Sequence, residues 1–269
     1  MKNILITILA LFLVNTISAQ DFQGIATYKS HRKIDLQLND GKQNAEMQKQ
    51  IQEQLRKQFQ REYTLTFNKH ESMYKQNEAL ETPSPKSSGI NIRIAGGSDI
   101  MYKNIKEKRY TNKMEIYGKV FLVKDNISLK KWELIDESKN IGEYTCFKAI
   151  FKDEVTSQTI NDKNKIEKVT KERTTTAWYT PQVPINNGPE DFSGLPGLIL
   201  EINDGNLTLI CSKLVLNAED KIEIKEPKKG KEVSQKKFDE IMEKKNKEMM
   251  DRVQSRRGSG ENVIIKVQG

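Results

Sequence analysis

The sequence predicts a mainly β protein: one curved antiparallel sheet, half-barrel-like in shape, with two flanking helices. Short runs that alternate apolar and polar residues cover most of the chain, and turn pairs such as Asp204-Gly205 separate them. Only two stretches, 43–60 and 234–253, repeat their apolar residues at helical spacing. Consecutive strands joined by tight turns favour an antiparallel meander with one covered face.

Residues 1–19 are typical of a cleavable secretory signal. Lys2 supplies the positive charge, an unbroken apolar run follows from Ile4 to Val14, and Ala19 precedes the cut. The apolar run is shorter than the roughly 20 residues that a membrane span needs, and no later stretch is apolar enough to span. We therefore expect an exported mature chain that starts at Gln20 and does not span a membrane.

The first part of the mature chain combines strands with one helix. Residues 24–33 and 62–68 alternate as strands do. Between them, residues 43–60 carry an apolar residue at every fourth position, which predicts a helical insert. Those apolar residues are Met47, Ile51, Leu55 and Phe59. Residues 78–99 contain prolines and glycines without a periodic pattern, which predicts an exposed, flexible loop.

From residue 100 onward the pattern is almost entirely that of strands. They are expected at 100–105, 108–117, 119–124, 132–135, 143–151, 172–180, 198–203 and 206–216. Residues 20–225 are therefore predicted to form one β domain. Residues 226–269 form a lysine-rich extension with a helix, which Ser234 is expected to cap and which Val233 and Phe238 staple.

The most informative stretch is the turn-rich segment 181–197. Within it, Pro181, Pro184 and Pro189 fix φ and remove backbone donors, so the segment cannot pair inside a sheet. Leu195-Pro196-Gly197-Leu198 has the signature of a type II turn. A rigid loop of this kind either plugs one end of the sheet or holds binding residues. The candidate binding residues are Trp178 and Tyr179, which point to opposite faces of a strand, and Asp191 and Phe192 in the loop.

This stretch resembles the GLPGLI family, named for the hexapeptide that stands here at Gly194-Leu195-Pro196-Gly197-Leu198-Ile199. The similarity extends to Ala177-Trp178-Tyr179-Thr180, Gly188-Pro189, Phe192, Gly142–Ala149 and Gly24–Tyr28, and it is densest between Lys131 and Asn203. The hexapeptide, Gly188 and Pro189 are expected to be structural. The helical insert and the lysine-rich extension lie outside the family pattern.

The resemblance implies an exported protein of the Bacteroidota, from a family with no assigned activity. Some members of that family are encoded near TonB-dependent outer-membrane transporters, which implies a setting in the cell envelope. It implies no mechanism.

Patterns of catalytic or metal-binding residues are almost lacking. Around Ser193, Asp191 replaces the first glycine of a serine-hydrolase elbow, and a strand follows instead of a helix. His31 and His70 end two neighbouring strands and are expected roughly 20 Å apart, too far to share a metal. We therefore expect no catalytic set, metal or cofactor. The basic balance, 45 Lys and Arg against 37 Asp and Glu, would suit nucleic acid, but export excludes that partner.

The chain contains two cysteines, Cys146 and Cys211. An oxidising compartment permits a disulfide between them. Two strands are predicted to lie between them, so a flat sheet would separate them by roughly 14 Å, beyond the limit of about 7 Å for bonded Cα atoms. A bond would therefore need a sheet that curls toward closure, and the sequence leaves both the thiol and the disulfide form open.

These observations favour an exported, non-catalytic binding or accessory module, located in the periplasm or on the periplasmic face of the outer membrane. Its partner would be an outer-membrane transporter, another envelope protein, or an apolar ligand in the concave face of the sheet. The carrier half-barrels of the periplasm are an analogy of fold only. One alternative is a periplasmic hydrolase of peptides or glycans with an unrecognised carboxylate site, and another is a structural protein that fills the periplasm.

Overall fold

The computed structural model describes residues 22–33, 60–78, 99–116, 118–160, 166–218 and 222–256. The predicted signal at 1–19 lies outside these residues, as do almost all of the predicted helix 43–60 and of the predicted loop 78–99. Within the described ranges, no helix combines the length and the apolar character that a membrane crossing requires.

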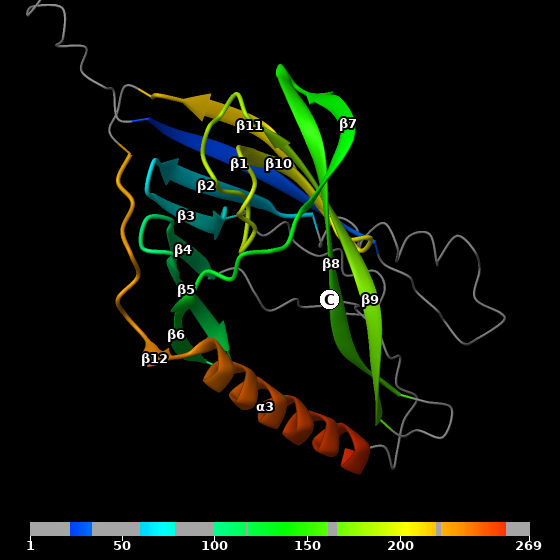
Figure 1. The fold of residues 1–269 in the computed structure, drawn as a ribbon. Coiled ribbons are helices and arrows are strands. Elements are labelled where there is room, and N and C mark those ends of the chain that lie inside the picture. Colours follow the sequence, from blue (N-terminus) through cyan, green and yellow to red (C-terminus); the bar gives the residue numbers. More distant parts are fainter. Residues whose placement is uncertain are drawn as a thin grey trace, which may run out of the picture.

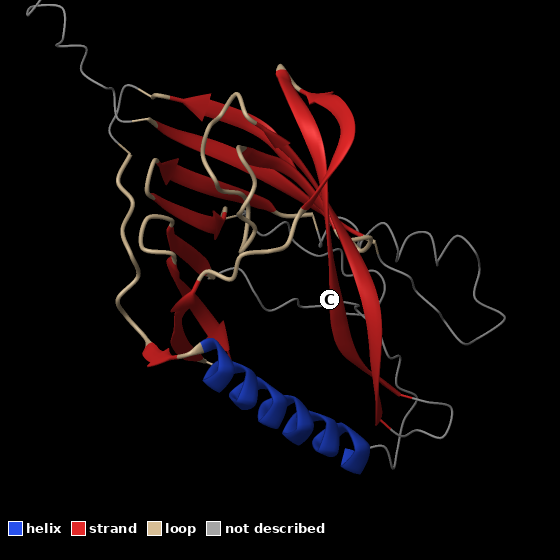
Figure 2. Cartoon of the chain, viewed as in Figure 1, coloured by secondary structure: helices blue, strands red, loops and turns tan. Residues whose placement is uncertain are grey.

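The described residues form one curved, open sheet of twelve strands and one helix (Figures 1 and 2). The strands are β1 (Gln23–Arg32), β2 (Glu62–Asn68), β3 (Glu71–Gln76), β4 (Ile100–Asn104), β5 (Arg109–Ile116), β6 (Lys119–Asn126), β7 (Glu133–Ile141), β8 (Tyr144–Ile160), β9 (Ile166–Thr180), β10 (Leu198–Asn203), β11 (Leu207–Leu216) and β12 (Lys231–Val233). Their order across the sheet is β12-β6-β5-β4-β3-β2-β1-β11-β10-β9-β8-β7. The prediction of a mainly β fold with a curved sheet is confirmed.

Neighbouring strands are antiparallel, as predicted, except at one edge. β12 pairs with β6 in parallel, with Lys231 opposite Phe121 and Val233 opposite Val123. The chain reaches that edge through an extended segment, 222–230, which follows β11 in the chain and runs along one side of the sheet to β12 (Figure 1). Glu226 in this segment accepts hydrogen bonds from Arg109 and Thr111 of β5, and these bonds hold the segment against the sheet.

The main core lies on one face of β1–β3, which we call the inner face. Ala26 of β1 stands opposite Leu65 of β2, and Leu65 stands opposite Tyr74 of β3, so the three side chains point to the same side. All three are buried, as are Tyr28 and Phe67 beside them. The alternation that predicted β1 and β2 therefore marks the face that the protein covers.

Two of the strands are much longer than the sequence predicts. β8 and β9 extend past the ends of β7 and β10, where they pair only with each other as a two-stranded arm. Polar cross-strand pairs hold the arm: Arg173 donates to Asp153 through two nitrogens, at 3.0 and 2.6 Å. The prediction ended both strands early because this part of the hairpin has no apolar alternation.

The helix α3 (Gln235–Arg256) confirms the helix predicted in the C-terminal extension. Lys237 N donates to Ser234 Oγ at 3.3 Å, so Ser234 caps the helix. Phe238 is buried against Phe121 of β6, with the ring centroids 5.6 Å apart, and it shares a cluster with Val233. The first turns of α3 are thereby anchored beside β6.

Cys146 on β8 and Cys211 on β11 are free thiols in the structure. Two strands, β9 and β10, lie between them, as predicted. Both nevertheless pack in the same hydrophobic cluster as Tyr28. The curl of the sheet thus brings together the regions of the two cysteines.

Candidate binding site at the loop 181–197

The loop 181–197 connects β9 to β10 and folds back over the inner face of the sheet, where it appears as the yellow-green trace in front of β1–β3 (Figure 1). Its Val183 and Ile185 are buried in the cluster that contains Ala26, Leu65 and Phe67. Leu195 is buried in a second cluster, with Tyr179 and Ile199. The loop therefore fills part of the concave side with apolar side chains.

Backbone hydrogen bonds attach the loop to the start of β10. Leu198 N donates to Val183 O and Ile199 N donates to Asn187 O, both at 3.0 Å. Gly197 has a φ of +159°, far from the roughly +80° that a type II turn needs there, so the predicted type II turn does not form. Gly197 N donates instead to Leu195 O at 2.8 Å, which gives a tighter three-residue turn about Pro196.

Two glycines of the stretch that resembles the GLPGLI family, Gly188 and Gly197, are required by close packing. A Cβ at Gly197 would lie 2.2 Å from Thr180 O, and one at Gly188 would lie 2.8 Å from the Cβ of Ile199. Both positions therefore exclude any side chain. Pro189, Leu198 and Ile199 are buried nearby, whereas Pro196 is exposed. These residues thus allow the loop 181–197 to pack closely against the end of β9 and the start of β10.

A buried lysine of β4 holds the loop from the side of the sheet. Lys103 is 1% exposed, and its Nζ donates to Gly188 O at 2.9 Å and to Phe192 O at 3.1 Å. Burial, opposed by the negative charge of Asp191, lowers the pKa of Lys103 to about 7. Lys103 thus fixes both ends of the turn 188–192.

Glu190 occupies the centre of this turn. It has a φ of +49°, a left-handed conformation that is costly for a residue with a side chain. Burial, reinforced by the neighbouring charge of Asp191, raises the pKa of Glu190 to about 7. Arg32 and Lys103 oppose that increase. A carboxyl group that changes its charge near neutral pH is therefore held inside the candidate site.

A rim of charged and aromatic residues surrounds the turn. Lys130 Nζ lies 2.7 Å from Asp191 Oδ2 and also faces the ring of Phe192, 5.0 Å from its centroid. Trp132 Nε1 donates to Ser193 O at 2.9 Å, and its ring lies 6.3 Å from that of Phe192. Asp191 and Phe192, both predicted as binding residues, therefore meet at this rim.

The other two predicted binding residues lie away from the rim. Tyr179 is 6% exposed and belongs to the core beneath Leu195. Trp178 points to the opposite face, as predicted, where it is half-buried and the Nζ of Lys139 lies 4.4 Å from its ring centroid. The ammonium group thus covers the indole face that would stack on a ligand.

Among the described residues, no group of three or more His, Cys, Asp and Glu side chains is arranged as a metal site. Three important residues of the site were not predicted from the sequence: Lys103, Lys130 and Glu190. Lys103 stands in an ordinary strand, and its acceptors lie 85 and 89 residues further along the chain. No local pattern of residues could have predicted that contact.

Comparison with known proteins finds one family model that matches part of the chain, and it assigns no activity. A family model described as "Protein of unknown function (Porph_ging)" matches residues 132–201. This range contains β7, the loop 181–197 and most of β10. The GLPGLI assignment remains a resemblance. No curated protein matches the chain.

Two solved structures are similar to the fold, "Structure of PNGF-II in C2 space group" and "Structure of PNGF-II in P21 space group". Both are 12% identical to this chain, with TM-scores of 0.48 and 0.49, and the similarity covers 83% of this chain. The chain spans only 33% of the length of each.

Proposed function

We propose that the mature protein is an exported, non-catalytic binding module of the cell envelope that acts through contact with a protein partner. The observation that carries this proposal is the filling of the concave side by Val183, Ile185 and Leu195. These side chains occupy the surface that an apolar ligand would need. A protein partner is therefore favoured over a ligand carried within the sheet.

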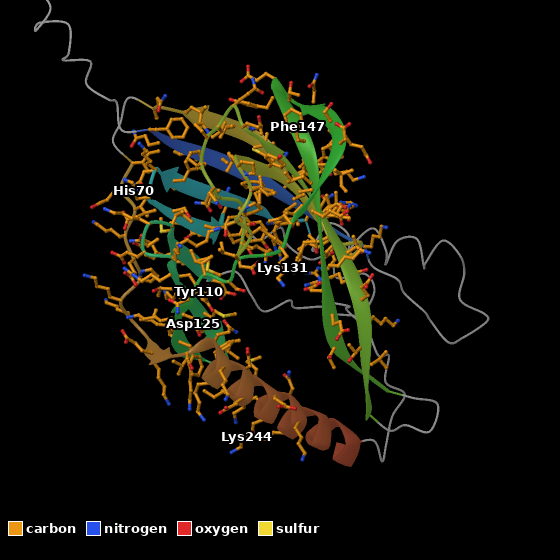
Figure 3. The ribbon with its side chains drawn as sticks, in the orientation of Figure 1. His70, Tyr110, Asp125, Lys131, Phe147 and Lys244 are labelled. Atoms are coloured by element: carbon orange, nitrogen blue, oxygen red, sulfur yellow. The ribbon has the colours of Figure 1, made fainter. Side chains whose placement is uncertain are left out.

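Exposed apolar side chains supply a contact surface for such a partner. Leu134 of β7 is 60% exposed and Phe147 of β8 is 42% exposed. Leu134 stands opposite Ala149, two residues from Phe147, so both side chains lie on one face of the β7–β8 hairpin. Figure 3 places Phe147 on β8, at a distance from α3 and Lys244. We call Leu134 and Phe147 the hairpin patch.

Cross-linking in the native cells tests the proposal. A photo-reactive residue at position 147 is expected to capture an envelope protein, identified by mass spectrometry, and Leu134→Asp is expected to abolish the capture. Ile210→Asp is the matched control, since Ile210 is an exposed apolar residue of β11, 38% exposed, outside the hairpin patch. Recovery of the protein free and monomeric, without a partner, would contradict the proposal.

The hydrolase alternative is supported by one observation, the carboxyl group of Glu190. Its pKa, raised to about 7, suits a general acid, and Asp191 supplies a second carboxylate in the same turn. Hydrolysis of a panel of peptides or glycans that Glu190→Gln abolishes without loss of folding would establish this alternative. Equal rates in both proteins would exclude Glu190 from catalysis.

A further inference from the structure

Three buried hydrogen-bond donors lie together on the inner face beneath the turn 188–192. Ser72 of β3 stands directly opposite Lys103 of β4. Tyr74 is two residues further along β3, so its side chain points to the same face. Ser72 is 0%, Tyr74 5% and Lys103 1% exposed. We call these three residues the donor cluster.

The donor cluster has hydrogen-bonding capacity that the described residues do not use. The hydroxyl groups of Ser72 and Tyr74 have no hydrogen-bond partner among them. Lys103 donates two of its three N–H groups to the carbonyls of Gly188 and Phe192. Burial also raises the pKa of Tyr74, so its hydroxyl remains a donor at neutral pH. Leaving a buried donor unpaired costs about 1–3 kcal/mol.

The electrostatics of the cluster favour a negative ligand. Lys103 makes no ion pair within the part of the chain that the structure describes; its strong contacts are neutral carbonyls. Asp191 and Glu190 face it from the loop and attract its charge, while Lys130 repels it. Burying a cation without a close counter-ion is costly. An anion would offset that cost and would also supply acceptors for the unused donors, whereas a neutral ligand would supply acceptors without offsetting the charge.

We propose that Ser72, Tyr74 and Lys103 form a binding site for a small anion beneath the turn 188–192, with formate as the probe. The hydrogen bond from Lys103 to Phe192 is only partly buried, which places the rim of the loop at the outer side of the site. The proposal is independent of the partner suggested for the hairpin patch.

Thermal unfolding in sodium formate tests the site, with ionic strength held constant by sodium gluconate, whose anion is much larger. Formate at about ten times its Kd is expected to raise the Tm of the mature protein by about 3–6 °C, with saturation. Tyr74→Phe and Ser72→Ala are each expected to reduce that rise by at least about half, since each removes one of the donors. The matched control is Thr175→Val. Thr175 is also a buried, unpartnered hydroxyl, but it lies on β9, so this variant keeps the full response.

The sign of the Tyr74→Phe effect separates the possible outcomes. If the hydroxyls simply lack a ligand, Tyr74→Phe raises the Tm in gluconate and formate has no effect on either protein, which overturns the proposal. If a water molecule fills the site, Tyr74→Phe lowers the Tm but formate again has no effect, and the anion is excluded.

A crystal soaked in bromide gives a direct test. An anomalous peak within contact distance of Tyr74 and Lys103 supports the site, and its absence at saturating bromide counts against it.

Discussion

Glu190 combines an unfavourable backbone conformation with a carboxyl group in an unfavourable environment. Its φ is +49°, and burial raises its pKa to about 7 from an ordinary value near 4.5. A raised carboxyl pKa means that the folded protein prefers the protonated form. The stability that this group gives is therefore present below pH 4.5 and is lost as the pH rises through 7.

Glu190→Gln should accordingly stabilise the protein in a pH-dependent way. Relative to the wild type, we expect the free energy of unfolding to be about 1–2 kcal/mol higher at pH 8 and nearly unchanged at pH 4, since glutamine cannot ionise. Urea unfolding at the two pH values measures this. Glu190→Gly also lacks the carboxyl group, so it should show the same difference between the two pH values, with an additional gain from the relieved backbone that is equal at both. A Gln effect that is equal at pH 4 and pH 8 would show that the carboxylate is not destabilised.

Gly197 is expected to tolerate no substitution. Alanine there would place a Cβ 2.2 Å from Thr180 O, a clash with backbone that no side-chain rotation can relieve. We expect Gly197→Ala to cost about 4 kcal/mol or more, measured by the midpoint of thermal or urea unfolding. Gly142 is the control, since it has a φ of +60° but a Cβ added there would meet nothing within 4 Å. Gly142→Ala should cost only about 1–2 kcal/mol, for the backbone alone.

At the scale of elements, the loop 181–197 depends on a strand far from it in sequence. Lys103→Met would keep a long side chain on β4 but leave the carbonyls of Gly188 and Phe192 without their donor. At pH 6 we expect the amides of Leu198 and Ile199, which bond to the loop, to exchange hydrogen about 10–100-fold faster. Mass spectrometry of hydrogen exchange checks this.

The comparison variant for the loop is Lys130→Met. Lys130 pairs with Asp191; its own side chain is 14% exposed and that of Asp191 is 60% exposed. Methionine keeps the packing against Phe192, and water reaches the carboxylate that is left, so the loss of this pair should cost little stability. We expect this variant to change the same exchange rates by less than about fivefold. If both lysine variants loosen the loop equally, Lys103 has no special role in holding it.

The elements that the sequence predicted well are those with one covered face. β1 and β2 alternate because Ala26, Tyr28, Leu65 and Phe67 all enter the same core. β3 was missed, since its two inward residues are Ser72 and Tyr74, which do not stand out as apolar. The far part of β8 and β9 was missed for a different reason: its sequence has no regular alternation of apolar and polar residues.

Only the part of the candidate site that depends on local backbone geometry could be predicted from the sequence. The prolines and glycines of the loop determine local backbone geometry, so their importance is visible in the sequence. Lys103 acts through contacts between distant segments, and a lysine in a strand is usually a surface residue. Glu190 looks like any other acidic residue until the fold buries it.

At the scale of the whole molecule, an open sheet must protect its edges. β12 is an edge of only three residues, whereas β7 is an edge of nine. A long, regular edge strand can pair with another chain. In β7 the pairing with β8 is interrupted: Ile135 stands opposite Lys148, and Ser138 stands opposite Phe147, so Asp136 and Glu137 form a bulge. The bulge interrupts the regular edge and carries two exposed acidic residues, of which Glu137 pairs with Lys148 of β8 at 2.9 Å.

Deleting Asp136 and Glu137 should turn β7 into a regular edge. The deletion joins Ile135 to Ser138, whose partners Lys148 and Phe147 are already adjacent on β8, so the ladder becomes continuous without a shift of register. We expect the deletion variant to self-associate increasingly with concentration, by light scattering after size-exclusion chromatography, under conditions in which the wild type does not. The double variant Asp136→Asn and Glu137→Gln keeps the bulge without its charges. If the bulge protects the edge, this variant stays close to the wild type; if it associates as strongly as the deletion, the charges alone are the protective feature.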